Sequence, residues 1–448
     1  MSKRLIVVLA LALVVGLTFS AAYAEVQNVK VSGDLNILGV ARNQFDLNRG
    51  GKGNKNNDSE SYFATQTRLR VDADLTDNVL VTLRLINERS WNVQDESNTN
   101  IDLDLAYATL KEFLYSPLSI TLGRQELMYG NQLIMGNAGA FNIDAPGVAA
   151  ARLNGLSSDL SVKKAFDAIK ATLNYDPLVI DAFYAKIDRN NARGNENDDV
   201  DLYGIYATYD INKKLSADLY GLYKNDSSAD KNDKIYTIGT LVKASPLTDL
   251  KTSLEAAIQL GNMRNAPSAS NDKRLAFAFQ AIGEYTLSKV KMTPMIGASY
   301  TYLSGDKRDY NGKRGWNQMY YNQALNNIAY AIIPFTNLSV LNLKGSIKPM
   351  DDVTVALNYG WYRRAKANTS NMLNPATDGD GTWYDGGPGY VMDKKKALGN
   401  EIDATITYDY TEDVQLGLTA GWFMPGKAFN TVNRRDATQL IGSMKVTF

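Results

Sequence analysis

The chain has 448 residues with balanced charge (48 Lys plus Arg, 48 Asp plus Glu) and contains neither Cys nor His. These counts exclude disulfide frameworks, Cys- or His-ligated metal centres and catalytic triads that need an imidazole, and they provide no basic footprint for nucleic acid. A hydrophobic content of 44% with a mean hydropathy of −0.28 is too polar for a bundle of membrane helices. The 26 Tyr and 34 Gly against 11 Pro indicate many strands and turns.

Residues 1–24 have the features of a secretory signal peptide. Two basic residues precede an apolar run over residues 5–19, and the Ala-Tyr-Ala segment 22–24 is typical of a cleavage site. We therefore expect cleavage before Glu25 and a single mature domain over residues 25–448. A retained anchor helix is the alternative, although the run is short for a membrane span of about 20 residues.

Segments of roughly ten residues with alternating apolar and polar side chains recur along the mature chain, as in transmembrane β-strands. The apolar positions of one segment are Val414, Leu416, Leu418, Ala420 and Trp422. Segments 79–86 and 250–259 alternate in the same way. Because charged residues occupy the interleaved positions, we expect the apolar face to contact lipid.

The breaks between these segments alternate between short and long. Eight short breaks lie near residues 75–78, 115–117, 175–177, 211–214, 245–249, 287–289, 348–352 and 411–413. Nine long breaks lie near residues 48–60, 92–99, 130–162, 190–198, 226–233, 263–272, 304–336, 366–398 and 425–436. This pattern predicts an all-β, antiparallel up-and-down barrel of 18 strands with short periplasmic turns and long extracellular loops, closed because an open sheet edge is unstable in hydrocarbon.

The last segment ends in an aromatic residue, Phe448, on an alternating strand. Such an end resembles the signal that the outer-membrane insertion machinery reads, so this machinery is an expected partner. Tyrosines and tryptophans near strand ends predict interfacial girdles. We expect a monomer in the bacterial outer membrane, surrounded by its lipid and lipopolysaccharide.

Three stretches resemble the alginate export family of outer-membrane porins. They are residues 122–130 (LGRQELMYG), residues 163–170 (KKAFDAIK), and residues 398–405 (LGNEIDAT) with 422–426 (WFMPG). The second stretch departs from the family pattern, with Ala168 in place of Gly and Lys170 in place of Arg. The resemblance implies an 18-stranded barrel, in agreement with the count of strands. The basic, polyuronate-conducting lumen of well-known members is not carried over, because the lumen expected here bears both charges.

Placing the apolar positions outward directs many charged side chains into the lumen, which avoids the roughly 2–4 kcal/mol that a lipid-facing Arg costs at mid-depth. The candidate pore-lining residues are Arg68, Arg70, Arg84, Glu88, Asp102, Asp104, Arg124, Lys170, Glu255, Lys344, Arg364, Glu401 and Asp403. Opposed charges would create a transverse field that orients solutes. Charges that pair into ladders would stiffen the barrel instead, and the sequence leaves both interpretations open.

Arg124 and two long loops do not fit the simple pattern of alternating strands and polar loops. Simple alternation along residues 118–122 would direct Arg124 into lipid, so we predict a bulge near Gly123 that resets the alternation. The alternative is an early strand end that leaves Arg124 at the headgroup level. Loop 130–162 contains an apolar stretch and loop 304–336 is rich in aromatic residues, so each is expected either to fold into the lumen or to cap the barrel mouth.

Two short acidic segments resemble a calcium site and a catalytic pair of carboxylates. Segment 378–385 resembles the start of a calcium loop, but it lacks the Gly and Glu that an EF-hand needs at positions six and twelve, so we expect an ordinary turn, no metal and no cofactor. Asp102 and Asp104 lie about 7 Å apart by strand rise, a spacing compatible with glycosidase geometry. Nothing in the sequence indicates a raised pKa at either carboxyl, so we do not expect an enzyme.

The sequence therefore predicts a porin that allows passive passage of small polar or charged solutes, anions included, through a charged, water-filled lumen. Export of an acidic, alginate-like polysaccharide is the first alternative. A closed barrel that serves as a surface adhesin or structural anchor is the second.

Overall fold

The computed structural model describes residues 28–47, 59–91, 101–138, 156–188, 199–227, 233–265, 270–306, 314–367, 372–373, 390–431 and 434–448. The expected signal peptide, the calcium-like segment 378–385 and the apolar stretch of the 130–162 loop lie outside the described residues. Within the described residues, no helix has the length and apolar character to cross a membrane.

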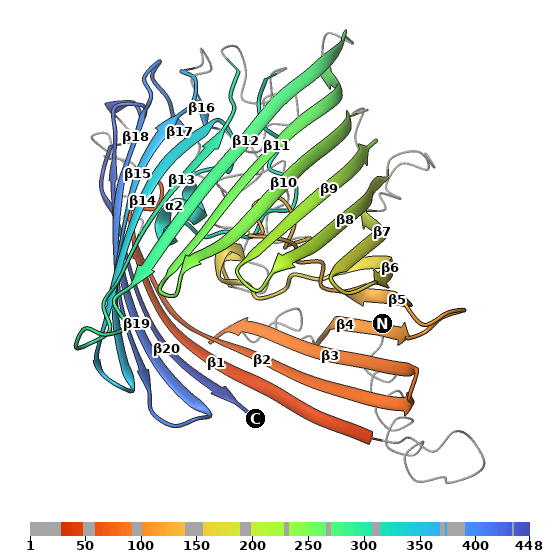
Figure 1. Cartoon of the computed structure of the whole chain (residues 1–448). Helices are drawn as coiled ribbons and strands as arrows, with labels where there is room; N and C mark the ends of the chain where they lie inside the picture. Colours follow the sequence, from red (N-terminus) through yellow and green to blue (C-terminus); the bar gives the residue numbers. More distant parts are fainter. Residues whose placement is uncertain are drawn as a thin grey trace.

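One antiparallel sheet of 18 strands forms the framework of the described chain (Figure 1). Its strands are β1 (Asn28–Asn43), β2 (Ser59–Thr76), β3 (Val79–Ser90), β4 (Asp102–Leu110), β5 (Leu118–Gln125), β6 (Phe166–Asn174), β7 (Leu178–Asp188), β8 (Val200–Asn212), β9 (Leu215–Asp226), β10 (Asp233–Leu247), β11 (Leu250–Asn265), β12 (Ser270–Thr286), β13 (Met295–Leu303), β14 (Leu338–Met350), β15 (Val353–Arg364), β18 (Ala397–Asp409), β19 (Val414–Pro425) and β20 (Ala437–Thr447). A separate pair, β16 (Met372–Leu373) and β17 (Tyr390–Val391), lies between β15 and β18 in the chain.

Each strand of the main sheet pairs with the next along the chain, and β15 pairs with β18. The ring closes because β20 pairs with β1, from Asp34 opposite Thr447 to Asn43 opposite Thr438. The predicted 18-stranded antiparallel barrel is therefore confirmed. Closure gives every strand of the main sheet a neighbour on both sides, so the sheet has no open edge strand.

The strand connections alternate in length as expected, with both ends of the sheet at the short-turn end. Some loop boundaries differ from the prediction by a few residues. The expected 263–272 loop is shorter, because β11 continues to Asn265 and β12 begins opposite it at Ser270. Backbone pairing needs no apolar side chain, so a strand can extend past the end of its apolar pattern.

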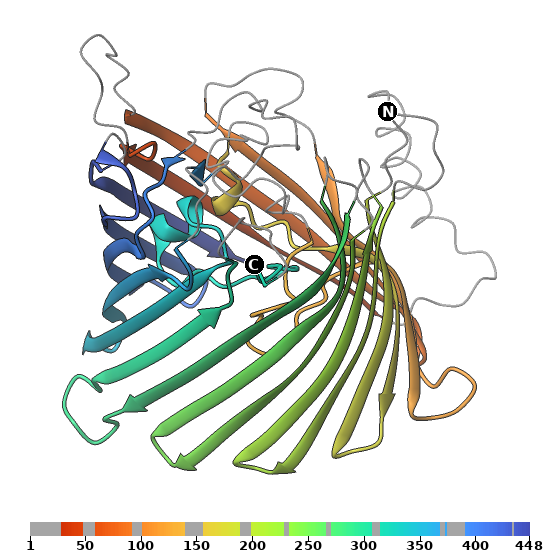
Figure 2. The same cartoon turned by 90° about the horizontal axis from the view of Figure 1, so that it is seen from above.

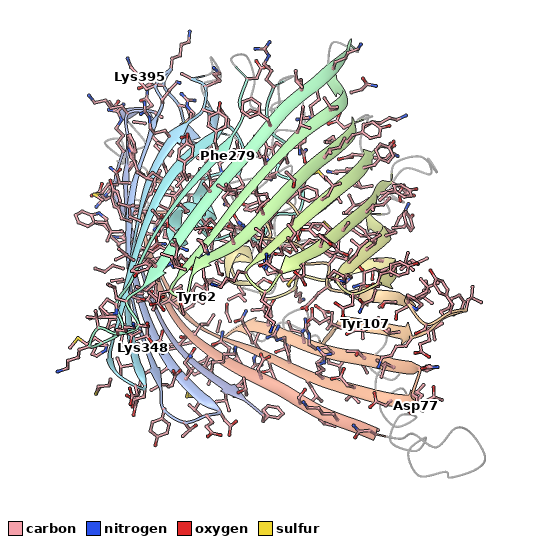
Figure 3. The ribbon with its side chains drawn as sticks, viewed as in Figure 1. Tyr62, Asp77, Tyr107, Phe279, Lys348 and Lys395 are labelled. Atoms are coloured by element: carbon pink, nitrogen blue, oxygen red, sulfur yellow. The ribbon has the colours of Figure 1, made fainter. Side chains whose placement is uncertain are left out.

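The outward face of the barrel carries the apolar positions of the alternating strands, among them Phe279 of β12 (Figure 3). Members of this face are exposed by half or more: Ile205, Leu219, Ile238, Leu254 and Phe277. Trp361 and Trp422 lie outward near the long-loop end, with 41% and 47% of their surface exposed. This face is the apolar band with an aromatic border that a membrane barrel presents to lipid.

Two long connections fold into the ring of strands rather than away from it (Figure 2). The β5–β6 loop (described residues 126–138 and 156–165) contains the short helix η2 (Ser158–Leu160), and the β13–β14 loop (described residues 304–306 and 314–337) contains α2 (Asn327–Ile332). We call these two segments the inner loops. Their buried apolar side chains, among them Leu133, Trp316, Tyr320 and Ile328, form one core with inward residues of the wall.

Candidate functional site

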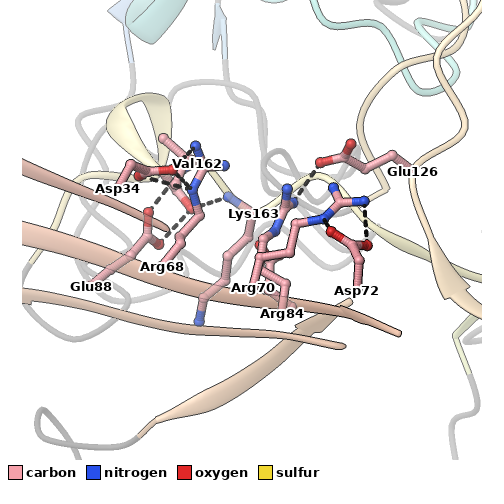
Figure 4. Close-up of polar contacts among 11 residues, drawn as sticks. Asp34, Arg68, Arg70, Asp72, Arg84, Glu88, Glu126, Val162 and Lys163 are labelled. Atoms are coloured by element: carbon pink, nitrogen blue, oxygen red, sulfur yellow. Dashed lines mark hydrogen bonds and ion pairs between the residues drawn. The ribbon is translucent and has the colours of Figure 1, made fainter. Parts of the chain in front are cut away.

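The inner faces of β1–β4 carry a row of ion pairs (Figure 4). Arg68 bonds Asp34 at 2.8 Å, and Arg70 bonds Asp72 on the same strand at 2.7 Å. The side chains of the first pair are 20% and 18% exposed, and those of the second pair are 35% and 32% exposed. These guanidinium and carboxylate groups are paired while part of their surface remains open to the interior.

Arg84 of β3 bridges the wall and an inner loop. Its Nε donates to Asp104 of β4 at 2.6 Å, and one terminal nitrogen donates to Glu126 of the β5–β6 loop at 2.5 Å. Asp104 occupies a bulge, because Leu105 and then Leu103 face successive residues of β3. The bulge leaves the Asp104 side chain buried beside Arg84, where its charge is compensated.

Polar contacts toward the long-loop end attach the second half of the β5–β6 loop to the same wall. Glu88 accepts hydrogen bonds from the Gln66 side chain and the Ser161 hydroxyl, each at 2.8 Å. Lys163 forms an ion pair with Asp102. We call the β1–β4 inner face with its charged residues the charged wall: Asp34, Arg68, Arg70, Asp72, Arg84, Glu88, Asp102 and Asp104.

The η2 segment is anchored by a buried arginine of β1 that the alternation directs inward. Arg42 of β1 forms an ion pair with Asp159 at 2.5 Å and donates to the Ser157 hydroxyl at 2.7 Å. Both charged side chains are almost fully buried, at 3% and 4% exposure. A buried pair of this kind stays stable only while both partners are present, so the contact fixes the position of η2.

The two inner loops contact each other inside the barrel. Met135 and Tyr320 form a parallel bridge, and the Asn322 amide donates to the Gln132 side chain at 2.7 Å. Asn131 reaches past this bridge to the wall and donates to the Ser253 hydroxyl at 3.0 Å. Both loops were expected either to fold inward or to cap the mouth, and the described parts fold inward.

Two carboxylates on β18 hold the β13–β14 loop. The Glu401 carboxylate accepts the backbone N–H groups of Ile328 and Ala329, each at 2.6 Å. Asp403 accepts the Asn326 side-chain amide at 2.9 Å. Both acids face the interior as expected from the alternation, but α2 covers them, and they retain only 0% and 4% exposure. Their role in the structure is to anchor a loop.

Three tyrosines stack across the inner faces of β7–β11, and each donates to a carboxylate. Tyr129 of the β5–β6 loop stacks on Tyr206 at 4.5 Å, and Tyr206 stacks on Tyr220 at 5.3 Å. Their hydroxyls donate to Asp181, Asp218 and Glu255, respectively. The predicted residue Glu255 is therefore buried under the stack, and Lys170 lies at its edge, 3.9 Å from Asp181.

The remaining inward candidates differ in their surroundings. Lys344 of β14 is exposed and lies on the same face as buried Asn342. Arg364 is 2% exposed, and its guanidinium donates to the carbonyls of Asp393 and Lys395. Arg364 therefore supports the backbone that precedes β18.

The bulge predicted near Gly123 is absent, because β5 keeps regular pairing through Arg124 with β4 and through Gln125 with β6. Arg124 lies on the outward face, opposite Asp167, and forms an ion pair with it at 3.0 Å. Its placement among the pore-lining residues was wrong. As in the alternative of an early strand end, β5 ends one residue later, at Gln125. In addition, Asp167 on the next strand pairs with the outward charge.

A family profile described as alginate export matches residues 39–443. The chain belongs to the alginate export family. No curated protein sequence matches it. The family is one of transport channels rather than enzymes, and the outer membrane is the location of this barrel. The short-turn end is therefore periplasmic and the long-loop end extracellular.

Solved structures with the same fold include a doubly substituted OccD1 (OprD), which is 10% identical with a TM-score of 0.57 over 95% of this chain and 97% of that chain. OccK11 (OpdR) of Pseudomonas aeruginosa is 12% identical with a TM-score of 0.54, over 95% of this chain and 98% of that one. The outer membrane protein OpdK of Pseudomonas aeruginosa is 11% identical with a TM-score of 0.54, over 94% and 100%. At these identities the likeness shows the fold.

The periplasmic end of this alginate export family barrel contains a hollow of about 430 Å³ beneath Asn131, between the inner faces of β8–β12. Four lysines line it: Lys213, Lys214, Lys243 and Lys251. The acidic residues in its lining are Asp210 and Glu284. The excess of ammonium groups makes this hollow electropositive, unlike the charged wall, which carries three arginines and five acidic residues.

Lys164, in the β5–β6 loop beside the charged wall, has an unusual protonation equilibrium. Burial lowers the pKa of its ammonium group to about 8, although the nearby Glu88 and Asp159 carboxylates oppose this shift. Its charge therefore changes close to neutral pH. Among the described residues, no cluster of three or more acidic side chains could hold a metal ion.

Proposed function

We propose that this channel allows passive diffusion of small polar or charged solutes through a water-filled part of the lumen along the charged wall. The observation that carries the proposal is the partial exposure of the Arg68–Asp34 and Arg70–Asp72 pairs. Partly exposed ion pairs are stable beside water, whereas the inner loops and their apolar core fill much of the remaining described interior.

The mixed charge of the wall supports weak selectivity between anions and cations. The two partly exposed arginines of the row each hold a carboxylate, so a passing solute meets both signs of charge along the wall. A solute carboxylate or ammonium group can exchange with one member of a pair, which lowers the cost of leaving bulk water. The inner loops limit the size of what passes.

Export of an acidic polysaccharide is the second candidate. The family description supports it, and so does the lysine-lined hollow at the periplasmic end, where an exported polyanion would enter. The two candidates differ in where binding occurs: a polyuronate chain would occupy the hollow for longer than a small solute would.

The test is a swelling assay with liposomes that contain the refolded mature protein and solutes graded in size and charge. The proposal expects rates that fall with solute size and depend little on the sign of charge. Inhibition of this swelling by oligouronates added on the periplasmic side, with a loss of inhibition in K243Q/K251Q, would favour export. Impermeable liposomes with verifiably folded barrels would contradict both candidates and leave the adhesin or anchor alternative.

Phe448 supports the proposed interaction with the insertion machinery. Its backbone pairs with Gly33 through two hydrogen bonds of 2.8 and 3.0 Å, so the end of the chain joins the closing seam of the barrel. Phe448 as a whole residue is 64% exposed. An accessible terminal aromatic at the closing strand suits recognition before the seam forms.

A further inference from the structure

We propose that the extracellular rim over β15 and β18 carries a binding site for the phosphate groups of a phosphorylated glycolipid of the outer leaflet. The site is a basic rim patch of five exposed residues: Arg363, Lys366, Lys394, Lys395 and Lys396. Lys395 projects from the end of the barrel opposite to Lys348 (Figure 3). This inference concerns the lipid-facing surface and is independent of the solute that the lumen conducts.

Arg363 lies on the lipid-facing side of the rim. Its neighbours Tyr362 and Arg364 are each 2% exposed and face the interior, whereas Trp361 and Arg363 face outward. The Arg363 guanidinium lies over the Trp361 ring, 5.1 Å from its centroid. Outward tryptophans mark the headgroup level of a membrane, and two residues of strand add about 7 Å beyond it. Arg363 is therefore placed among lipid headgroups.

The three consecutive lysines are held by buried contacts. The Arg364 guanidinium donates to the Lys395 carbonyl at 2.9 Å, and the Arg364 backbone N–H donates to the Lys396 carbonyl at 2.8 Å. Asn337 fixes Lys366 in the same way, accepting its backbone N–H at 2.8 Å. The backbone under the patch is thus fixed, while the ammonium groups extend into solvent.

The charge of the patch is not compensated by the ion pairs of the described chain. The carboxylate next to it, Asp393, bonds Arg434 at 3.2 Å and the Asn430 amide at 3.0 Å. None of the five patch residues takes part in an ion pair with another described residue. The local excess of positive charge attracts phosphate, and arginine can bind it through two parallel hydrogen bonds.

The position of the basic rim patch in the membrane indicates which lipid it binds. The patch lies at the extracellular end of strands that cross the outer membrane, so the headgroups beside Arg363 belong to the outer leaflet. The lipid of that leaflet carries phosphate on a glucosamine disaccharide. A patch that attracted solutes to the pore entrance would face the lumen. Arg363 instead lies on the lipid-facing side, beyond Trp361.

The probe is bisphosphorylated, hexa-acylated lipid A in phosphatidylcholine vesicles that contain the refolded mature protein. Lipid A retained per barrel is measured by mass spectrometry after extraction in mild detergent. The variant R363Q/K394Q/K395Q/K396Q is expected to retain lipid A at least about tenfold more weakly, since each basic group near a lipid surface contributes about 1 kcal/mol. The control K111Q/K289Q/K291Q/K348Q removes four exposed lysines at the periplasmic end and should retain lipid A like the wild type.

The wild type should lose retention with dephosphorylated lipid A and at high salt. Equal retention by the patch variant, or equal retention of dephosphorylated lipid A, overturns the proposal. A patch variant that retains lipid A but changes solute swelling rates also overturns it, because the patch then belongs to the pore entrance. If the fourfold variant does not fold, K394Q/K395Q alters only exposed side chains and is expected to weaken retention measurably.

Discussion

Met135 and Tyr320 form a parallel backbone bridge inside the barrel, and this bridge joins two loops that leave different parts of the wall. One loop is attached to β7 through Tyr129 and Asp181, and the other to β18 through Glu401. The loops thus form a single crossbar whose ends are anchored on separate strands. Any passage through the described interior is set by this crossbar and by the wall opposite it.

A disulfide between the loops tests whether the crossbar is the conducting arrangement. The chain contains no native Cys, and the Gln132 and Asn322 side chains are in contact at 2.7 Å. We expect Q132C/N322C to cross-link on oxidation with no fall in single-channel conductance and with less current noise. Closure of the channel on oxidation, reversed by a thiol, would mean that conduction needs the loops apart.

Removal of the Glu401 carboxylate should release α2. E401A leaves the Ile328 and Ala329 N–H groups without acceptors, and hydrogen bonds to a charged group contribute about 1.5–3 kcal/mol each. We expect a lower unfolding free energy, by about 3 kcal/mol or more, and faster proteolysis between residues 314 and 337. E401Q should have an intermediate effect. E412A, in an exposed periplasmic turn, should leave both quantities unchanged.

Arg84 should control both stability and selectivity. R84M leaves Asp104 and Glu126 without their cation, and loss of one partner of a buried pair costs about 3–5 kcal/mol. We expect a lower denaturant midpoint and a reversal potential shifted toward cation preference in a salt gradient. R89M, on the exposed outward side of the same strand, serves as the control. An unchanged reversal potential would place the solute path away from the charged wall.

The low pKa of Lys164 predicts a pH dependence of stability. The folded chain releases the proton near pH 8, whereas the unfolded chain keeps it up to about 10.5, so the unfolded state binds more protons between these values. The unfolding free energy should therefore rise with pH across this window, by an amount on the order of 3 kcal/mol relative to K164M. Denaturant titrations of both proteins at pH 7 and pH 10.5 measure it. A difference in unfolding free energy between the wild type and K164M that stays constant with pH would contradict the lowered pKa of Lys164.

Gly123 should tolerate no side chain. Its φ is +120°, and a Cβ there would lie 2.2 Å from the Ala106 carbonyl oxygen of β4. We expect G123A to lower the unfolding free energy by about 1–3 kcal/mol, the strain of such a backbone with a side chain. G221A is a matched control in a strand, because a Cβ at Gly221 meets nothing within 4 Å. Equal unfolding free energies of G123A and G221A would contradict a strained backbone at position 123.

The side on which a strand residue lies could be predicted from the sequence, since alternation is local. Leu254 outward and Glu255 inward are both as expected. Whether an inward charge meets water could not be predicted, because that depends on loops distant in the chain: Glu401 is covered by Ile328 and Ala329. Arg124 was misplaced for a related reason, since its compensating partner Asp167 lies on the next strand, beyond a long loop.

Other residues of the interior carried weak signals. Glu126 and Lys163 lie inside the stretches that resemble the family, yet the sequence does not indicate that they pair with Arg84 and Asp102. The alternation of apolar and polar residues does not indicate the bulge at Asp104. The bulge was therefore predicted at Gly123 instead. Local periodicity predicts the strands that form the wall of a barrel. The placement of the inner loops depends on contacts between residues distant in the sequence, which periodicity does not indicate.

The most direct test of the account is the single-channel current of the refolded mature protein in a planar bilayer under a salt gradient. We predict a steady open conductance with a small reversal potential, because the charged wall offers both signs of charge along the solute path. Absence of conductance from barrels shown to be folded would contradict an open path along that wall. A large reversal potential of either sign would contradict a solute path that offers both signs of charge.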